Sequence, residues 1–566
     1  MSKSLTLLFS LLSLASAAEL TWTSCGTGLE CSSLTVPLEY DRSTTSTATA
    51  SIALIRYLST VAKDQRLGSL LVNPGGPGAS GYSFVQSGAG EAISKITGGL
   101  YDVVGWDPRG VGKSTPLMQC FPNAGEEFTF SEALPGGPNL WLGMYSNSSY
   151  DAEVETKITD FDASVKELAD ACVAENSDAL YTSSAAYVAR DMAAIVDAVD
   201  GTTAKLNYWG FSYGTIFLAE FIQAFPERVG RVVADGAVNP EANAMTYDNQ
   251  LPNDQISMRD ALNDLISFCE DAGTNCPLAT PPDGVTGTLT ERIDNLFETL
   301  FKDPVVYNGF AISLDSFNVL LWSLMRVPVT WSMVANIIAG LEIRDPTAFL
   351  TTVSGTAATA PTDAKAPGVA TLREFPLTCI DNAASSSVTL KTVIDLTKSL
   401  SIDQDTPLLN AGLKPITFCR HFPDTRPLVP PAGISSMAKT DIMLSEAKIT
   451  ILIVNPEHDT ATPLVSAEKL RSLLPKSSRL AIRRGPGHTS VSLASLSLTQ
   501  TIRDFFVDGT VPDDLVSHST DQDLFPAGSG KSLVTAAAFN GTSYTPEDMA
   551  LLEADYAILL AFLAIA

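Results

Sequence analysis

The stretch Gly210-Phe211-Ser212-Tyr213-Gly214 follows the pattern G-x-S-x-G. An apolar, aromatic run at 206–209 precedes it, and a run with helical spacing at 215–225 follows it. The pattern predicts a strand, a sharp turn and a helix, with Ser212 at the apex of the turn. The two glycines are required because a side chain at either position would collide with the neighbouring strand or helix. We therefore expect the Ser212 hydroxyl to stand clear of the sheet, where a base can reach it.

Short apolar runs alternate with helical runs on both sides of this motif. Strands are predicted at 70–72, 101–106, 206–209, 229–234, 449–454 and 479–483, and helices at 185–199, 215–225 and 464–474. The alternation predicts an α/β fold, in which a mostly parallel, doubly wound sheet is covered by helices on both faces. Residues 19–60 are expected to add antiparallel strands at one edge of the sheet.

The alternation fades between residues 246 and 440, where helical runs at 255–270, 285–301 and 314–341 dominate. We expect this region to form an inserted, mainly helical cap. The predicted organisation is a signal peptide at 1–18, a first part of the α/β core at 19–245, the cap at 246–440, a second part of the core at 441–515, and a C-terminal tail at 516–566.

The composition is that of a globular enzyme. Of the 566 residues, 45% are hydrophobic and 17% are charged, which excludes a disordered or fibrous chain. The formal net charge of −27 argues against a nucleic-acid partner, because phosphate binding needs clustered Lys and Arg. Cysteine and histidine show no zinc-ligand spacing in the sequence, so we expect neither a metal nor an organic cofactor.

The first residues are typical of a signal peptide. Lys3 provides a positive charge, an apolar stretch follows at 5–14, and Ala15-Ser16-Ala17 offers a cleavage site. The alternative, an N-terminal helix of the fold, is disfavoured because the stretch ends in small residues and is too short to span a membrane. We therefore predict a secreted, extracellular protein. Sequons at Asn147 and Asn540 would be usable on that route.

Eight cysteines predict disulfide bonds in an oxidising compartment. Many pairings are possible, and the sequence alone does not choose among them. Proximity suggests Cys25–Cys31 and Cys269–Cys276, which leaves Cys120–Cys172 and Cys379–Cys419 as the remaining pairs.

The apolar C-terminal run at 557–566 allows two interpretations, although it is too short to span a bilayer. It could be the tail of a glycolipid-anchor signal. However, Thr545-Pro546-Glu547-Asp548 has the composition of a helix start, with Pro and acidic residues in the first turn. This favours a closing helix packed on the body of the protein.

A serine hydroxyl needs a base to take its proton, and the chain has four histidines. His518 lies in a polar tail segment and His421 in the expected cap, while His458 adjoins Asp459 on one loop. Because adjacent side chains on one loop point in different directions, His458 is not expected to be the histidine that Asp459 orients. His488 follows the last predicted strand, in a loop expected to overhang Ser212, and we predict that it is the base.

A carboxylate must orient the imidazole. Asp459 follows the strand before the His488 unit, and the gap between them leaves room for one helix and one strand. Asp235, at the end of the strand after the serine helix, is the rival candidate. The order Ser212, Asp459, His488 favours Asp459.

Attack on a carbonyl creates an oxyanion, which needs backbone N–H donors. The stretch Asn73-Pro74-Gly75-Gly76-Pro77-Gly78 follows an early strand, and Pro77 has no N–H to give, so Gly76 is the expected donor there. Tyr213, next to the nucleophile, is the expected second donor. Asp107-Pro108-Arg109-Gly110 is interpreted as a structural brace near the serine.

At these residues the chain resembles the alpha/beta-hydrolase superfamily and, more narrowly, its secreted tripeptidyl and prolyl aminopeptidases. The resemblance depends on the motifs at 73–78, 107–112, 210–214, 235–236 and 487–488, and on the stretch 449–512. It implies that Cys379 pairs with Cys419 in the cap. It also implies that a cap carboxylate holds the free amino terminus of a substrate, a role for which Asp381 is the candidate; a solvated aspartate is the alternative.

The sequence thus predicts a secreted serine hydrolase that acts on a short peptide with a free amino terminus. A carboxylesterase, or a tailoring hydrolase of secondary metabolism, that acts on a small hydrophobic ester or lactone is the alternative. A non-catalytic, adhesion-type hydrolase fold is disfavoured because Ser212, Asp459 and His488 are all present. No membrane span is expected, and the sequence is silent on the oligomeric state.

Overall fold

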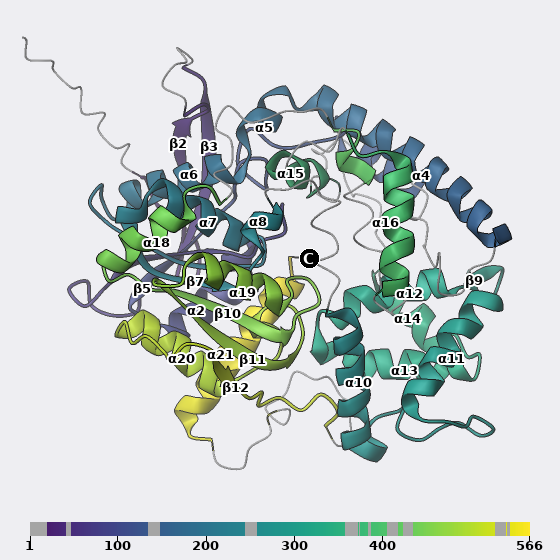
Figure 1. Ribbon diagram of the computed structural model, residues 1–566. Helices are drawn as coiled ribbons and strands as arrows, with labels where there is room; N and C mark the ends of the chain where they lie inside the picture. Colours follow the sequence, from purple (N-terminus) through teal and green to yellow (C-terminus); the bar gives the residue numbers. More distant parts are fainter. Residues whose placement is uncertain are drawn as a thin grey trace, which may run out of the picture.

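The computed structural model describes residues 20–40, 47–133, 148–243, 257–356, 372, 374–382, 387–403, 417–422, 434–526, 539 and 544–565. Figure 1 shows a core of sheet and helices on one side and a large group of helices on the other. The expected signal peptide and the two sequon asparagines, Asn147 and Asn540, lie outside the described residues.

The core is built on one ten-stranded sheet in the order β1-β2-β3-β5-β4-β6-β7-β10-β11-β12. Its strands are β1 (Thr23–Gly26), β2 (Leu29–Pro37), β3 (Thr49–Tyr57), β4 (Gly68–Asn73), β5 (Tyr101–Trp106), β6 (Leu206–Phe211), β7 (Val229–Asp235), β10 (Ile451–His458), β11 (Ser478–Pro486) and β12 (Val516–His518). The pairs from β1 to β5 are antiparallel, and all pairs from β5 onward are parallel. The α/β architecture with an antiparallel edge is therefore confirmed.

Helices cover both faces of the sheet because the side chains of each strand alternate between two apolar cores. Leu71 of β4 faces the first core, whereas Leu70 and Val72 face the second. The first core includes residues of α6 (Ala185–Val199), α7 (Gly214–Ala224), α18 (Met437–Glu446) and α19 (Leu464–Leu473). The second includes residues of α2 (Gly90–Ile96), α20 (Leu496–Val507) and α21 (Pro546–Leu563).

The C-terminal apolar run belongs to α21, which packs against α2 and α20. Thr545 caps this helix through a reciprocal hydrogen-bond pair with Asp548, as the composition of its first turn predicts. Leu552 and Ile558 on its inner face are fully buried. The interpretation as a closing helix is confirmed.

The helices outside the core form two groups. The first cap lobe, residues 258–356, consists of α10 (Met258–Ala272), α11 (Leu289–Lys302), α12 (Leu314–Met325), α13 (Trp331–Glu342) and α14 (Thr347–Thr356), with a small hairpin of β8 (Val305–Tyr307) and β9 (Phe310–Ile312). It has an apolar core of its own, which Leu493, Leu524 and Phe525 join from the C-terminal part of the chain. The single helical run expected at 314–341 is wrong, because Val327-Pro328 breaks it into α12 and α13.

The second cap lobe combines segments from both sides of the serine motif. It contains α4 (Ser148–Glu175), α5 (Ser177–Thr182), α15 (Glu374–Asp381), α16 (Leu390–Asp403) and residues 417–422. Figure 1 shows α4 as a long arch over this lobe, with α16 beside it. Phe161, Val165 and Leu168 of α4 share an apolar core with Phe375 and Phe418.

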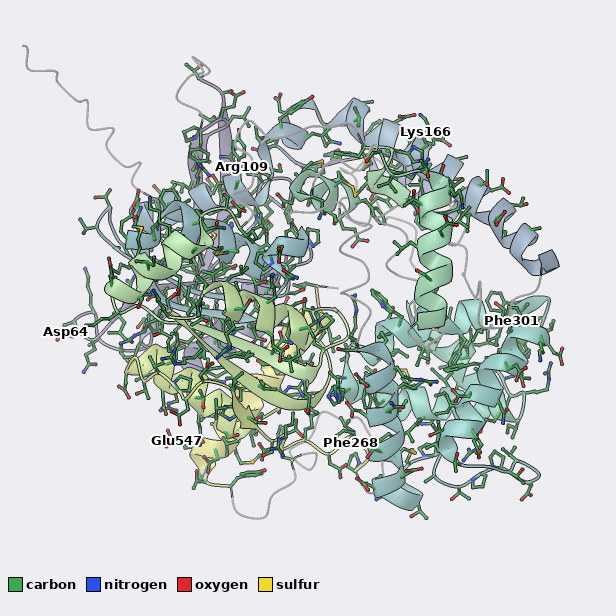
Figure 2. All side chains as sticks on the ribbon, in the orientation of Figure 1. Asp64, Arg109, Lys166, Phe268, Phe301 and Glu547 are labelled. Atoms are coloured by element: carbon green, nitrogen blue, oxygen red, sulfur yellow. A yellow bond between two sulfur atoms is a disulfide. The ribbon has the colours of Figure 1, made fainter. Side chains whose placement is uncertain are left out.

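Arg109 braces the core next to the serine motif, as the sequence predicts. Its guanidinium donates two hydrogen bonds to Asp191 of α6, at 2.6 and 2.8 Å, and others to the carbonyl oxygens of Leu38 and Pro37. Both side chains of the ion pair are almost fully buried, with exposed fractions of 0% and 1%. Figure 2 shows Arg109 in the core and Lys166 on α4 of the second cap lobe.

We expect Asp191→Ala to lower the free energy of unfolding by about 3–5 kcal/mol, because it leaves a buried guanidinium without its counter-charge. Urea denaturation followed by fluorescence measures the effect. The control is Asp170→Ala, which removes an exposed partner of Lys166 on α4 and should change the free energy of unfolding by less than ~1 kcal/mol. Equal effects of the two substitutions would contradict a bracing role for Arg109.

Candidate active site

The serine turn has the strained geometry that the G-x-S-x-G pattern predicts. Ser212 has φ 52°, a left-handed conformation that few residues other than glycine adopt. A Cβ at Gly210 would lie 2.4 Å from the ring of Tyr208, and one at Gly214 would lie 3.0 Å from the carbonyl oxygen of Asn73 on β4. A side chain at Gly210 would therefore force the ring of Tyr208 to move, and one at Gly214 would be in unusually tight contact with β4.

The candidate residues gather at the carboxyl ends of four adjacent parallel strands. Ser212 follows β6, Asp235 ends β7, Asp459 follows β10 and His488 follows β11, and these strands are neighbours in the sheet. Ligands of open α/β sheets bind at this edge of the sheet. The backbone N–H of Ser212 donates to the carbonyl oxygen of Asp235 at 2.8 Å, which ties the serine turn to the next strand.

Asp459 contacts the imidazole of His488. The Nδ1 atom of His488 lies 3.0 and 3.1 Å from the two carboxylate oxygens of Asp459, which is fully buried. Burial alone would raise the pKa of Asp459, but the charge of His488 and hydrogen bonds from His488, Thr462 and Thr489 lower it below its usual value. The carboxylate therefore stays ionised and can hold the imidazole with its Nδ1 protonated and its Nε2 free to accept a proton.

Thr462 supports Asp459 and is a site residue that the sequence analysis missed. Its hydroxyl donates to Asp459 Oδ2 at 2.9 Å and its backbone N–H donates to Oδ1 at 2.8 Å. An aspartate that accepts from the backbone two or three residues ahead is a common turn motif, so Asp459-Thr460-Ala461-Thr462 carried a local signal for it.

Asp235, the rival carboxylate, does not contact His488. It accepts hydrogen bonds from the N–H and hydroxyl of Ser490, at 2.7 and 2.5 Å, and from the indole of Trp209 at 3.2 Å. Burial raises the pKa of Asp235 to about 6, partly offset by these bonds. Asp235 thus braces the loop that carries His488, whereas Asp459 orients the imidazole.

Ser212 Oγ makes no hydrogen bond to His488 among the described residues. Catalytic hydrogen bonds are commonly long in unliganded enzymes and shorten when substrate binds. The role of His488 as the base for Ser212 therefore stays a prediction. The structure brings His488 and Asp459 into contact and places Ser212 at the same edge of the sheet, two strands from β10.

The glycine loop after β4 packs directly on the serine turn. A Cβ at Gly75 would lie 2.8 Å from the backbone nitrogen of Tyr213 and 3.0 Å from Cβ of Ser212. Gly76 has φ 109°, and within the described part of the chain no hydrogen-bond acceptor engages its backbone N–H or that of Tyr213. The arrangement leaves both predicted donors available for an oxyanion.

Asp381 lies behind the serine turn, not open to solvent. Its carboxylate accepts hydrogen bonds from the hydroxyl of Tyr213 and from the N–H of Ala185, the latter at 2.8 Å. Burial raises the pKa of Asp381 to about 7 against the effect of these two bonds. The adjacent cavity, which Gly75 and Phe217 also line, holds only about 10 Å³. Its role in binding an amino terminus stays a prediction and requires this cavity to widen.

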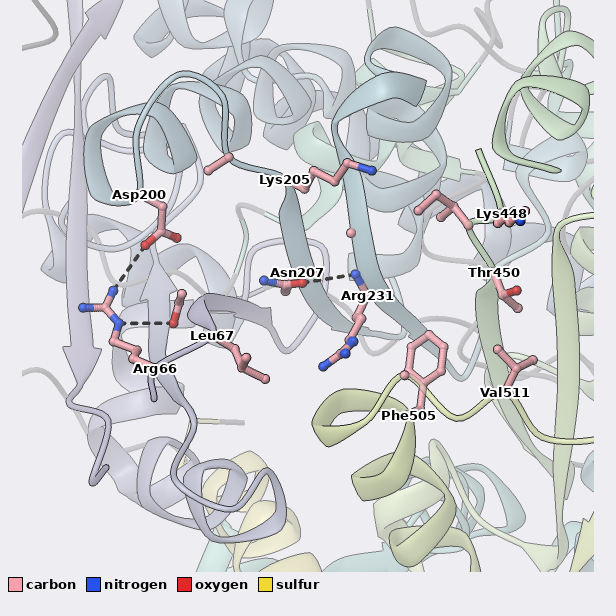
Figure 3. Close-up of a pocket in the computed structure, with 15 residues that line it drawn as sticks. Arg66, Leu67, Asp200, Lys205, Asn207, Arg231, Lys448, Thr450, Phe505 and Val511 are labelled. Carbon is pink, nitrogen blue, oxygen red and sulfur yellow. Dashed lines mark hydrogen bonds and ion pairs between the residues drawn. The ribbon is translucent and has the colours of Figure 1, made fainter. Parts of the chain in front are cut away.

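A second hollow lies at the opposite edge of the sheet, at the amino ends of β4, β6, β7 and β10 (Figure 3). It has a volume of about 670 Å³ and is lined by Arg66, Lys205, Arg231 and Phe505 among others. Because it lies at the far end of the strands from Ser212, its larger volume does not make it the reaction site.

Cysteine pairing matches the prediction. The disulfide bonds are Cys25–Cys31, Cys120–Cys172, Cys269–Cys276 and Cys379–Cys419. The described residues contain no group of His, Cys, Asp and Glu placed to hold a metal ion. In the same part of the chain, no helix is long and apolar enough to cross a bilayer.

Two curated peptidases match part of the chain. Serine protease Hip1 of Mycobacterium tuberculosis is 31% identical over 48% of this chain and 47% of its own length. Tripeptidyl aminopeptidase of Streptomyces lividans is 30% identical over 42% of each chain. The chain thus spans about half the length of these relatives. Carboxylesterase B of Mycobacterium tuberculosis is 26% identical over 85% of both chains.

Family models match both parts of the core. A model described as alpha/beta hydrolase fold matches residues 68–263, and a model described as TAP-like protein matches residues 419–518. The first match contains the glycine loop and Ser212, and the second contains Asp459 and His488. With these matches and the observed sheet, the chain has the alpha/beta-hydrolase fold, and its C-terminal part is similar to TAP-like proteins.

Proposed function

We propose that this chain is a serine hydrolase with Ser212 as nucleophile, His488 as base and acid, and Asp459 as the group that orients His488. The observation that carries the proposal is the buried Asp459–His488 pair at the carboxyl edge of the sheet that also bears the strained Ser212 turn. Strain at a serine between two closely packed glycines is typical of a nucleophile held for attack.

The reaction is acyl transfer to water in two steps. The Nε2 atom of His488 takes the Ser212 proton as Oγ bonds to the substrate carbonyl carbon, and the backbone N–H groups of Gly76 and Tyr213 stabilise the oxyanion. His488 then gives its proton to the leaving group, which departs from an acyl-serine. In the second step, His488 takes a proton from water, the hydroxide adds to the acyl carbon, and Ser212 recovers the proton as the acid leaves.

The favoured substrate is a short peptide with a free amino terminus. The similarity to a serine protease and to a tripeptidyl aminopeptidase supports this class. A small hydrophobic ester is the second candidate, because the relative named as a carboxylesterase aligns over 85% of the chain, a larger share than the peptidases do.

Parallel assays separate the two substrates. Tripeptidyl amides with free and with acetylated amino termini are compared with acyl esters of similar size. The peptidase proposal predicts cleavage of the free peptide, with kcat/KM at least about tenfold lower for the acetylated one, since an amine-binding group would lose its partner. Rapid ester cleavage without any release from peptides would instead establish the esterase.

We also propose that the protein acts outside the cell. The four disulfide bonds support this location, because such bonds persist in oxidising compartments. Amino-terminal sequencing of the mature protein from the culture medium tests it, with residue 18 or 19 expected first.

A further inference from the structure

The first cap lobe contacts the backbone of the candidate base. The N–H of His488 donates to the carbonyl oxygen of Arg326, the residue that follows α12, at 2.8 Å. Next to it, a Cβ at Gly487 would lie 2.7 Å from the ring of Pro328. Gly487 therefore lets the turn between α12 and α13 approach the histidine loop closely.

A second contact joins the same lobe to the end of β10. The Nδ1 atom of His458 lies 2.6 Å from Oδ2 of Asp264 on α10, and the exposed fractions of the two side chains are 28% and 21%. The carbonyl oxygen of His458 also accepts the N–H of Gly487, at 3.3 Å. The backbone of Gly487 and His488 is thus held between His458 on one side and Arg326 on the other.

We propose that the Asp264–His458 pair, together with the Arg326 and Pro328 turn, forms a clamp by which the first cap lobe positions His488 for catalysis. The proposal rests on the proposed serine hydrolase. In it, Asp264 and His458 are positioning residues, since neither contacts Ser212 or Asp459 by side-chain hydrogen bonds. Asp459 fixes the imidazole at Nδ1, and the clamp fixes the backbone from which the imidazole extends.

The clamp joins elements that also pack on one another. α10 packs against β10 and β11, and its ion pair lies where their carboxyl ends leave the sheet. Displacing a catalytic group by ~1 Å is enough to reduce a rate by about a hundredfold. Loss of the pair should therefore lower the reactivity of Ser212 by allowing the His488 loop to shift, with little effect on substrate contacts elsewhere.

The clamp should also depend on pH. The hydrogen bond to Asp264 raises the pKa of His458 above its usual value, against the effect of burial, and the charges of Asp264, Asp260 and Glu457 act in the same direction. Arg483 of β11 also interacts electrostatically with Asp264. Because the pKa is raised, the pair is fully formed below ~6.5 and is lost as pH rises through the folded-state value. The clamp needs His458 to be protonated, whereas His488 must be neutral to act as a base. Turnover should therefore fall at both acidic and alkaline pH.

The test is the rate at which a fluorophosphonate labels Ser212 in the full-length protein, measured across pH. We expect Ser212 of Asp264→Asn to be labelled on the order of tenfold more slowly than Ser212 of the wild type. The labelling rate should also begin to fall at a lower alkaline pH than in the wild type, while its decrease at acidic pH is unchanged. Asp264→Glu keeps the charge and should restore part of the labelling rate at alkaline pH. In His458→Gln, Ser212 should be labelled slowly at every pH, with no further decrease of the rate at alkaline pH.

Asp294→Asn is the matched control. It breaks an ion pair with Arg259 within the first cap lobe, at 3.2 Å, without touching the core, and should label as the wild type does. Wild-type rates and pH profiles in both Asp264→Asn and His458→Gln would overturn the clamp while leaving the hydrolase proposal intact. A wild-type protein that is not labelled at Ser212 would refute both.

Discussion

Ser212→Ala should reduce hydrolysis by a factor on the order of 10⁴ or more, the largest effect expected of any substitution in this chain. Without the hydroxyl no acyl-enzyme can form, and only substrate binding and the oxyanion donors remain to accelerate the reaction. The measurement is kcat/KM on the preferred substrate, with mass spectrometry of the fluorophosphonate adduct.

The fold should tolerate this change. Ser212 is held by its backbone, through its N–H to Asp235 and its carbonyl to Thr215, and alanine keeps both bonds. Ser472→Ala, at an exposed serine of α19, is the control and should retain full activity and labelling. Undiminished hydrolysis by Ser212→Ala would point to a different nucleophile, whereas a wild-type protein that hydrolyses none of the substrates would support the non-catalytic, adhesion-type alternative.

Asp459→Asn should lower kcat by a factor of about 10³–10⁴, with a smaller change in KM. An amide at this position can donate to Nδ1, which would leave the proton on Nε2, where it blocks acceptance of the serine proton. The imidazolium formed during the reaction would also lose its buried counter-charge. Steady-state kinetics at the optimal pH give the size of the loss.

Asp235→Asn is the matched comparison because it makes the same chemical change one strand away. Asp235 contacts Ser490 and Trp209, so this substitution should affect the stability of the loop and change kcat by less than Asp459→Asn does. If Asp235→Asn caused the larger loss of kcat, the roles assigned to the two carboxylates would have to be exchanged.

The core was predictable because its signals are local. The strand expected at 70–72 is β4 (Gly68–Asn73), and the helix expected at 185–199 is α6. Buried strands of a parallel sheet appear as short apolar runs, and glycines mark the turns that need them. The sequence also predicts that the side chains of His458 and Asp459 point in different directions. In the structure, His458 contacts Asp264 and Asp459 contacts His488.

The partners of the cap helices were not predictable, because contacts between distant segments leave no local signal. Asp264 and His458 are 194 positions apart. The predicted boundaries assign α4 to the core part of the chain, whereas its apolar side packs on Phe375 and Phe418. A helical pattern shows which side is apolar but not which segment covers it. The break at Pro328 does have a local signal, because proline interrupts a helix, but it lies inside a long apolar run.

The two-part construction of the second cap lobe has a consequence for synthesis. Asp162 of α4 forms its ion pair with Arg420, 258 positions later in the chain. At ribosomal speeds of 5–20 residues per second, α4 would wait roughly 10–50 s after emerging before its covering residues exist. During that interval its apolar side is open to premature aggregation. A nascent-chain holdase should therefore matter more for the yield of this protein than for a hydrolase whose lid is encoded in one continuous segment.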